Sequence, residues 1–214
     1  MTATKGLPTI SPYSLPRAED LPVPRAPWRP QRDRMALLVH DMQRYFCRPF
    51  DREASPLAPV VANIGRLVAH ARANGIPVFY TAQEGDQDWR DRGLQADLWG
   101  PGMTGAPEHQ PILPELRPAL GDFVLTKHRY SAFQRSNLET LMRAGGRDQL
   151  AVTGIYAHIG CTLTAADAFM RDIEPFFAAD ATADFCAEKH RMALSYVAGT
   201  CAVPMTTDQL LAAL

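Results

Sequence analysis

Polar residues that could do chemistry follow directly after apolar runs at several points of the sequence. Asp41 comes after one such run and Lys127 after another, while a third run is followed closely by Gly160 and Cys161. A thiol in this position could attack a carbonyl carbon, and a carboxylic acid could donate a proton to carbon. Many hydrolases place a nucleophile at such a turn, but here glycine occupies the turn and the cysteine falls one residue late. These residues therefore allow two chemistries, covalent attack by Cys161 or proton transfer from Asp41.

The apolar runs alternate along the chain with segments of helical periodicity. Strands are predicted over 35–40, 76–81, 122–126, 149–155, 174–179 and 201–205, and helices over 57–74, 137–144, 161–171, 187–198 and 207–214. The run at 35–40 is almost entirely apolar, as expected of a strand covered on both faces, and Pro204 predicts that the sixth strand lies at an edge. This alternation predicts an α/β fold, a three-layer doubly wound sheet of six parallel strands with helices on both faces.

Residues 1–33 are predicted to form a proline-rich N-terminal arm, followed by a single domain over 34–214. Seven of the 18 prolines precede residue 31, and proline suits neither a helix interior nor a central strand. Apolar residues such as Ile10 and Trp28 favour an arm that lies on the body, and a disordered tail is the alternative. Residues 84–121 are expected to form short helices and a lid-like excursion. We expect no appended carrier-protein domain.

The bulk composition excludes several classes of protein. Hydrophobic residues make up 46% and charged residues 21% of the chain, and the formal net charge is −1, so no basic field would draw the protein to nucleic acid or to anionic lipid. No apolar run approaches the ~20 residues that span a bilayer, and the N-terminus lacks an apolar signal core. The four cysteines and six histidines show no metal-ligand spacing, so we assign no metal. A reduced cytoplasmic protein is the simplest interpretation.

Ionisable or amide side chains stand at the end of each of the first five predicted strands. In an open parallel sheet, ligands bind outside the carboxyl ends of the strands, near the point where the strand order reverses. The polar residues at these ends are Asp41-Met42-Gln43, Gln83, Lys127-His128-Arg129-Tyr130, Tyr156 to Gly160, and Asp180. Their joint placement predicts an active site at this edge of the sheet.

Several motifs of the chain occur together in one known family. They are His40-Asp41-Met42-Gln43-Arg44-Tyr45-Phe46, Tyr80-Thr81-Ala82-Gln83, Trp99-Gly100-Pro101-Gly102, Arg129-Tyr130-Ser131-Ala132-Phe133, Tyr156-Ala157-His158-Ile159-Gly160-Cys161 and Asp167-Ala168-Phe169-Met170-Arg171-Asp172-Ile173. In this combination they resemble isochorismatase, a branch of the cysteine-hydrolase-like superfamily. The likeness covers essentially the whole chain and implies that residues 34–214 form an isochorismatase-like hydrolase domain.

By this resemblance, Gly160 stands where the related nicotinamidases carry the cysteine of an Asp, Lys and Cys triad. The same glycine marks isochorismatase and the phenazine-pathway 2-amino-2-deoxyisochorismate hydrolase. The resemblance also implies a non-proline cis peptide between Ile155 and Tyr156. The implied chemistry is hydrolysis of an enolpyruvyl ether, in which the terminal methylene carbon is protonated and no covalent bond to the protein forms. Asp41 is then the general acid.

Further site residues follow from the same resemblance. Lys127 orients Asp41, binds a substrate carboxylate, or does both. Arg92 resembles the family's carboxylate-binding arginine, and a guanidinium suits that task because its donors match a carboxylate in bidentate fashion. Gln83 is expected to bind substrate oxygens, and the backbone N–H of Gly160 could receive an anionic oxygen. The substrate ring is expected to lie between aromatic walls formed by Phe46, Trp99, Tyr130 and Tyr156.

The leading interpretation is hydrolysis of isochorismate to 2,3-dihydro-2,3-dihydroxybenzoate and pyruvate, for a siderophore or related secondary metabolite. A close rival is the same reaction on 2-amino-2-deoxyisochorismate, and the sequence does not separate the two. His128 departs from the tryptophan of the relatives, close to Lys127. Two hypotheses of a different class are a thiol amidohydrolase that uses Cys161 and a non-catalytic scaffold that docks a carrier protein. No cofactor is expected, the partner is a small dicarboxylate, and the resemblance implies a homodimer.

Overall fold

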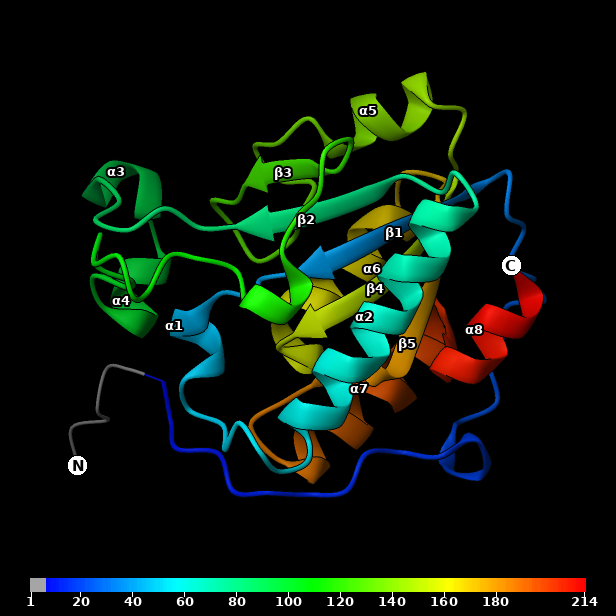
Figure 1. Cartoon of the computed structure of the whole chain (residues 1–214), viewed down its shortest axis with the longest axis horizontal. Helices are drawn as coiled ribbons and strands as arrows, with labels where there is room; N and C mark the ends of the chain where they lie inside the picture. The colour runs from blue at the N-terminus through cyan, green and yellow to red at the C-terminus, as the bar shows by residue number, and fades with distance from the viewer. Residues whose placement is uncertain (1–6) are drawn as a thin grey trace.

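A sheet of six parallel strands lies at the centre of the molecule (Figure 1). The computed structural model describes residues 7–214, and its strands are β1 (Met35–His40), β2 (Val78–Ala82), β3 (Phe123–Thr126), β4 (Gln149–Ile155), β5 (Glu174–Ala183) and β6 (Val203–Met205). Their order is β3-β2-β1-β4-β5-β6, and every neighbouring pair is parallel. The predicted α/β fold is confirmed, and β6, which contains Pro204, is an edge strand as expected.

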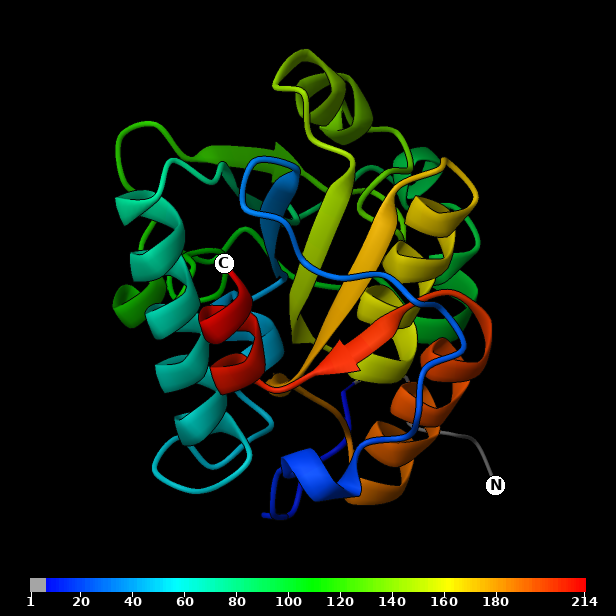
Figure 2. The same cartoon turned by 90° about the vertical axis from the view of Figure 1, so that its right-hand side faces the viewer.

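Helices cover both faces of the sheet, as Figure 2 shows. They are α1 (Arg44–Cys47), α2 (Leu57–Ala73), α3 (Trp89–Arg92), α4 (Gln95–Trp99), α5 (Leu138–Ala144), α6 (Thr162–Phe169), α7 (Ala187–Thr200) and α8 (Thr207–Ala213). Apolar residues of α2 and α8 join the core on one face of the sheet, and those of α5, α6 and α7 form the core on the other. None of the helices in the described residues is long and apolar enough to cross a membrane.

Strand β1 shows why the central strands are apolar throughout. All six of its residues are buried. Met35, Leu37 and Val39 belong to the core beneath α2, whereas Ala36 and Leu38 belong to the core beneath α6 and α7. Side chains of a strand point alternately to the two faces of its sheet, so a strand covered by helices on both sides has apolar residues at consecutive positions.

The structure corrects the predicted end of the fifth strand. β5 continues to Ala183, so Asp180, which was expected at the edge that carries the site, lies inside the strand. Its carboxylate accepts hydrogen bonds from the backbone N and the Oγ1 of Thr207, at 2.6 and 2.8 Å. These bonds satisfy a polar side chain within the strand and tie β5 to the first turn of α8. The helix predicted over 161–171 also differs, because it opens with a π-helical turn at Ala157–Cys161 before α6 begins.

Residues 84–121 hold only short helices, as expected. They include α3, α4 and a 3-10 helix, η2 (Pro114–Leu116). The buried side chain of Gln43 ties this segment to the sheet, because its Nε2 donates to the carbonyl oxygens of Gln83 and Gln110 at 2.8 and 2.6 Å. The segment is therefore fixed beside the carboxyl end of β1.

The order of the strands locates the natural binding site of this sheet. β1 has β2 on one side and β4 on the other, so the chain reverses direction across the sheet between β1 and β4. Crevices form outside the carboxyl ends of the strands at such a point. Asp41, Gln83, Lys127 and Tyr156 follow β1, β2, β3 and β4, each directly after the strand.

The N-terminal segment runs in extended form along the body (blue in Figure 1) and includes a 3-10 helix, η1 (Ala18–Asp20). Ile10 is buried, and its N–H donates to the carbonyl oxygen of Pro49 at 3.0 Å. The hydroxyl of Tyr13 accepts from the backbone N of Asp184 at 2.8 Å. Apolar and polar contacts thus hold this segment against the domain. Residues 1–6 of the predicted arm lie outside the described residues.

We predict that Tyr13→Phe destabilises the protein. Its hydroxyl also lies 3.2 Å from Nδ1 of His190, and its loss would leave the N–H of Asp184 without its acceptor. Leaving a buried donor unsatisfied costs about 1–3 kcal/mol, and urea unfolding would measure this loss. Tyr196→Phe is the matched control, because Tyr196 is 53% exposed. Equal unfolding free energies for the two variants would contradict the anchoring role of Tyr13.

Candidate active site

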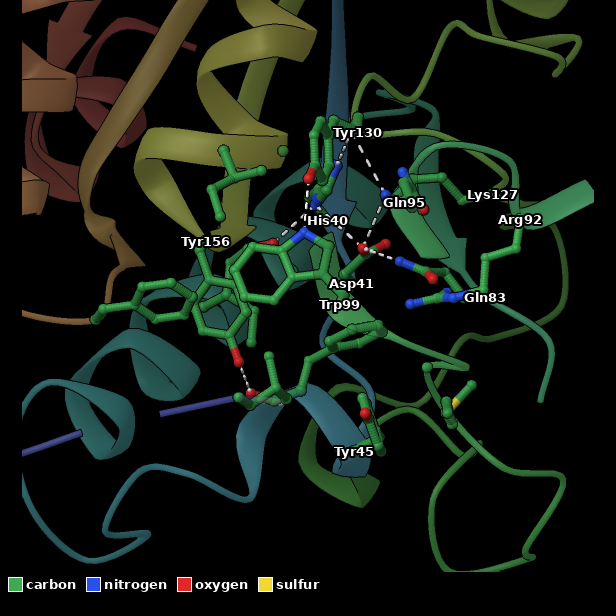
Figure 3. A pocket seen from close by; sticks show the side chains of 18 residues that line it. His40, Asp41, Tyr45, Gln83, Arg92, Gln95, Trp99, Lys127, Tyr130 and Tyr156 are labelled. Carbon is green, nitrogen blue, oxygen red and sulfur yellow. Dashed lines mark hydrogen bonds and ion pairs between the residues drawn. The ribbon is translucent and has the colours of Figure 1, made fainter. Parts of the chain in front are cut away.

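A pocket opens at the carboxyl ends of β1, β2, β3 and β4 (Figure 3). Its empty volume, including the open space at its mouth, is about 650 Å³. Every residue that the sequence predicted for the site lines it, namely Asp41, Phe46, Gln83, Arg92, Trp99, Lys127, Tyr130, Tyr156 and Gly160. The fold thus brings together residues that are up to 119 positions apart, from Asp41 to Gly160 (160 minus 41).

Asp41 is the most strongly held side chain of the pocket. It is 5% exposed, and Thr81 Oγ1 donates to its Oδ1 at 2.6 Å. Gln83 Nε2 and Lys127 Nζ lie 3.1 and 3.0 Å from its Oδ2. Strands β1, β2 and β3 therefore each contribute to one carboxylate, and all of these donors favour its ionised form.

Lys127 is shielded from water, since only 2% of it is exposed. Besides Asp41, its ammonium donates to the carbonyl oxygens of Arg129 at 2.7 Å and Tyr130 at 3.5 Å. Its backbone N donates to the carbonyl oxygen of Ala82 at 2.9 Å, which continues the pairing of β3 with β2 past the end of the strand. The direction of the Lys127 side chain is thus set by the sheet and by the loop that follows it.

The electrostatics of the site follow from burial and from this ion pair. Burial raises the pKa of Asp41, but the positive charge of Lys127 and the hydrogen bond from Thr81 oppose it, and the pKa lies below its usual range. Burial also lowers the pKa of His40, whose ring lies next to the pair. The free protein therefore carries an ionised Asp41 beside Lys127, with a neutral imidazole behind them.

Arg92 presents a free guanidinium end to the pocket. It is 6% exposed, and its Nε donates to the carbonyl oxygen of Gly100. Among residues 7–214 its two Nη atoms have no hydrogen-bond acceptor. Gly102 makes room for it, because a Cβ at this glycine, whose φ is +81°, would lie 2.7 Å from Nη2 of Arg92. A buried guanidinium with unused donors suits a carboxylate.

Aromatic side chains form one wall of the pocket and are fixed by their polar atoms. Trp99 Nε1 donates to the Tyr130 hydroxyl at 2.6 Å, and the Tyr156 hydroxyl donates to the carbonyl oxygen of Phe46 at 2.6 Å. The ring of Phe185 lies 4.4 Å from that of Tyr156, centroid to centroid. The peptide between Ile155 and Tyr156 is cis, as the sequence predicted. The pocket therefore combines a polar end at Asp41 with rigid apolar sides.

Gly160 and its neighbour Cys161 face opposite sides of the same turn. Gly160 lines the pocket, whereas Cys161 is fully buried in the core beneath α6 and α7, with Sγ 3.9 Å from the carbonyl oxygen of Thr153. Burial raises the pKa of the Cys161 thiol well above its usual value. A protonated thiol that points away from the pocket is a poor nucleophile.

Comparison with known proteins identifies the family. The family model described as the isochorismatase domain matches residues 35–209. The protein belongs to the isochorismatase family. It is 53% identical to the isochorismatase of Bacillus subtilis (strain 168), over 96% of this chain and 66% of that protein. It is 47% identical to phenazine biosynthesis protein PhzD of Pseudomonas fluorescens, over 96% of this chain and 98% of that protein.

The fold is shared with enzymes of a wider group. A cysteine hydrolase from Pseudomonas syringae pv. phaseolicola 1448A superposes with a TM-score of 0.80 at 26% identity, covering 89% of this chain and 96% of that one. This isochorismatase-family chain thus shares the architecture of a cysteine hydrolase, while the residue at its own active-site turn is glycine.

Several lining residues were not predicted from the sequence. They are Leu7, His40, Tyr45, Gln95, Met103, Ile155, Ile159 and Phe185, together with Gly102. The position of His40 within a strand predicts a buried and satisfied side chain, and it is buried, but its ring also borders the pocket. Gln95 lies between β2 and β3, away from any strand end, and Phe185 follows β5, whose end the sequence placed too early. His128, which departs from the family pattern, is not among the lining residues.

The side chains of His158 and His190 make hydrogen bonds within the protein, whereas Nε2 of His70 and Nδ1 of His128 are buried without a partner among residues 7–214. Nδ1 of His158 lies 2.6 Å from Oδ1 of Asp184. Nε2 of His190 lies 3.1 Å from Oγ1 of Thr182. Within residues 7–214, His, Cys, Asp and Glu side chains form no group of three or more that could hold a metal ion.

We predict that Lys127→Met changes how stability depends on pH. In the wild type the lowered pKa of Asp41 stabilises the fold above the ordinary value of 3.8, and this contribution is lost as the pH falls through the lowered value. Without Lys127, burial dominates and the pKa of Asp41 rises above 3.8, so the variant loses stability as the pH increases. Removing one partner of a buried pair costs about 3–5 kcal/mol at neutral pH.

Urea unfolding between about pH 4 and pH 8 would measure the difference between wild type and variant, which should grow with pH. Lys189→Met is the control, since Lys189 is exposed on α7. A difference that stays constant over this range would show that Lys127 does not set the ionisation of Asp41.

Proposed function

We propose that this protein hydrolyses the enolpyruvyl ether of isochorismate, giving 2,3-dihydro-2,3-dihydroxybenzoate and pyruvate. The observation that carries the proposal is the arrangement around Asp41: a carboxyl group held by Thr81, Gln83 and Lys127 lies in the pocket, opposite a turn where Gly160 offers no nucleophile. Membership in the isochorismatase family supports the same reaction. A site of this kind can transfer a proton but cannot form a covalent bond at residue 160.

The reaction proceeds by protonation of carbon. Asp41 donates its proton to the terminal methylene carbon of the enolpyruvyl group, which leaves an oxocarbenium ion. Water adds to this ion and returns a proton to the Asp41 carboxylate. The resulting hemiketal collapses to pyruvate and the ring alcohol, so the acid is regenerated and no atom of the substrate is joined to the protein. Carbon accepts protons slowly, and the enzyme therefore needs a well-placed acid.

The lowered pKa of Asp41 in the free protein has to be reversed before this step. An ordinary aspartate, with a pKa of ~3.9, costs about 4 kcal/mol to protonate at neutral pH. The substrate carries two carboxylates, and negative charge near Asp41 raises its pKa. Burial of the carboxyl likewise favours its neutral form. We therefore propose that the acid forms mainly in the substrate complex.

The remaining residues bind the substrate and exclude water. The free end of the Arg92 guanidinium binds one substrate carboxylate, and Lys127 orients Asp41 and neutralises the second. Gln83 reaches substrate oxygens from the end of β2, and the N–H of Gly160 faces an anionic oxygen. The aromatic wall that packs against the ring of the substrate is formed by Phe46, Trp99, Tyr130 and Tyr156.

A second candidate function is the same hydrolysis of 2-amino-2-deoxyisochorismate. The similarity to a phenazine biosynthesis protein over 98% of its length favours this candidate. The two substrates differ only in one hydroxyl or amino group, and both release pyruvate. Rates of pyruvate release from the two purified compounds under identical conditions would rank them. A thiol amidohydrolase is disfavoured by the burial of Cys161 on the far side of its turn.

The proposal places the enzyme in the biosynthesis of a siderophore or a related secondary metabolite, acting as a homodimer in the cytoplasm. This part rests on the likeness to the family and on the names of the relatives. Light scattering on the purified protein would measure its oligomeric state directly. A monomer at micromolar concentration would remove the homodimer from the proposal and leave the chemistry untouched.

We predict that Asp41→Asn loses about 10²–10⁴-fold in kcat, the contribution typical of general acid catalysis. The amide keeps the size of the side chain but has no acidic proton. Cys161→Ala is the matched control and should retain near-normal turnover. Pyruvate release from isochorismate, followed with lactate dehydrogenase and NADH, measures both.

Full activity of Asp41→Asn would contradict acid catalysis, and complete inactivity of a folded Cys161→Ala protein would support a thiol enzyme instead. Mass spectrometry of the quenched reaction gives an independent check. A covalent adduct on Cys161 would overturn the proposal even if the aspartate variant were slow.

The pH profiles of kcat and kcat/KM should differ. The kcat profile reports the substrate complex, where the substrate carboxylates raise the pKa of Asp41, and kcat/KM reports the free protein, where that pKa lies below 3.8. Both parameters fall as the pH rises through the pKa of the acid, so kcat should fall at the higher pH. Initial rates over a pH series would show this, and identical profiles would remove the reason for substrate-induced protonation.

A further inference from the structure

The imidazole of His40 stands in the space that a side chain at residue 160 would need. A Cβ built on Gly160 would lie 2.8 Å from Nε2 and 3.1 Å from Nδ1 of His40, and nearer still to Cε1. Real Cβ atoms essentially never come this close to other atoms. Alanine, and still more cysteine, is therefore excluded at residue 160 as long as the ring keeps its place.

The ring is anchored by one hydrogen bond and packed on its other edge, so it cannot easily move aside. Nδ1 of His40 lies 2.8 Å from the carbonyl oxygen of Ile155, and Nε2 lies 3.2 Å from that of Tyr130. His40 is 1% exposed and ends a strand that is otherwise apolar. Burying an imidazole has a cost, which the depressed pKa of His40 records. An apolar side chain at this position of the strand would donate no hydrogen bond to the carbonyl oxygen of Ile155.

The contacts of His40 indicate its role in the site. A neutral imidazole carries a single N–H, and the shorter contact, to Ile155, places it on Nδ1. Nε2 then packs 3.2 Å from the carbonyl oxygen of Tyr130, which also accepts from the ammonium of Lys127 at 3.5 Å. The imidazole is thus anchored at the carbonyl end of β4 and packs against the loop after β3 that directs Lys127 onto Asp41. Since His40 Nδ1 is 3.8 Å from Oδ2 of Asp41, too far for a direct hydrogen bond, its influence on the acid passes through that loop and Lys127.

We propose that His40 is a positioning residue. It fills the place of the absent nucleophile, and its ring, anchored at the carbonyl group of Ile155, packs against the carbonyl group of Tyr130 and so holds Lys127 against Asp41. The side chains at residues 40 and 160 are then sterically coupled. The ring requires glycine at the turn, and the missing Cβ of Gly160 leaves the space that the ring occupies. The catalytic half of this inference rests on the proposed function. The steric half is independent of any substrate.

The steric half is tested by a cycle of four proteins, the wild type, Gly160→Ala, His40→Ala and the double variant. Overpacking should lower the Tm of Gly160→Ala by roughly 3–10 °C relative to wild type. In the His40→Ala background the same methyl group should cost nothing or raise the Tm, because the ring no longer occupies its space. Gly199→Ala is the matched control, since a Cβ at Gly199 meets no atom within 4 Å.

An equal fall in Tm on adding Gly160→Ala to the wild type and to His40→Ala would overturn the steric half. If Gly160→Ala alone does not yield folded protein, folded double variant would support it, and an unfolded double variant beside folded His40→Ala would count against it. If His40→Ala does not fold, His40→Asn takes its place in the cycle.

The catalytic half is tested by the kinetics of pyruvate release in the same proteins. Misplacing a catalytic group by about 1 Å can cost about 10²-fold, so kcat of His40→Ala should fall by roughly that factor while KM changes little. His40→Asn, which keeps a donor near the carbonyl oxygen of Ile155, should recover part of the loss. Adding Gly160→Ala should lower kcat in the wild type but not in His40→Ala.

Wild-type kcat in folded His40→Ala, or a loss that appears only in KM, would overturn the positioning role. Equal kcat in His40→Ala and His40→Asn would show that the ring only fills space, which would also overturn the positioning role. If the wild type releases no pyruvate, the proposed function fails instead, and the Tm cycle still decides the steric half.

Discussion

The buried ion pair between Lys127 and Asp41 is the interaction on which the rest of the site depends. Two charges at 3.0 Å, with 2% and 5% of the residues exposed, have lost most of their hydration, and such a pair stabilises a protein only when further hydrogen bonds complete it. Thr81 and Gln83 donate hydrogen bonds to the carboxylate, and the ammonium donates to backbone carbonyl oxygens of the loop after β3. Three adjacent strands must therefore end in register for the pair to exist.

The same requirement explains which parts of the site could be predicted from sequence. Asp41, Gln83 and Lys127 each follow an apolar strand, and parallel strands bring their carboxyl ends to one edge of the sheet. A pattern that is local in sequence therefore predicts that these distant residues lie close together in space. The pattern failed at Asp180, because a buried partner on α8 lets a polar residue sit inside β5. It was silent on Gln95 and Phe185, whose positions depend on how loops fold over the pocket. The roles of His40 and Gly160 depend on distances of a few tenths of an ångström, which no spacing of residue types encodes.

Two consecutive residues of the turn after β4, Gly160 and Cys161, lie in different environments. Gly160 faces the pocket and Cys161 faces the core, since the π-helical turn at Ala157–Cys161 rotates successive residues to different sides. A thiol in the sequence next to an active-site turn is therefore no evidence of a thiol enzyme. Its neighbours decide its chemistry: apolar residues beneath α6 and α7 keep the sulfur protonated, and the pocket never reaches it.

The crowding between His40 and Gly160 also constrains how such a site can evolve. A path from this protein to a hydrolase with a side chain on the turn must shrink residue 40 first, which costs a cavity, and only then enlarge residue 160. The reverse order passes through an intermediate in which two groups compete for one space. In the opposite direction the order is reversed. Residue 160 has to become glycine before residue 40 can become histidine. In this protein the imidazole at residue 40 and a side chain at residue 160 thus exclude each other by volume.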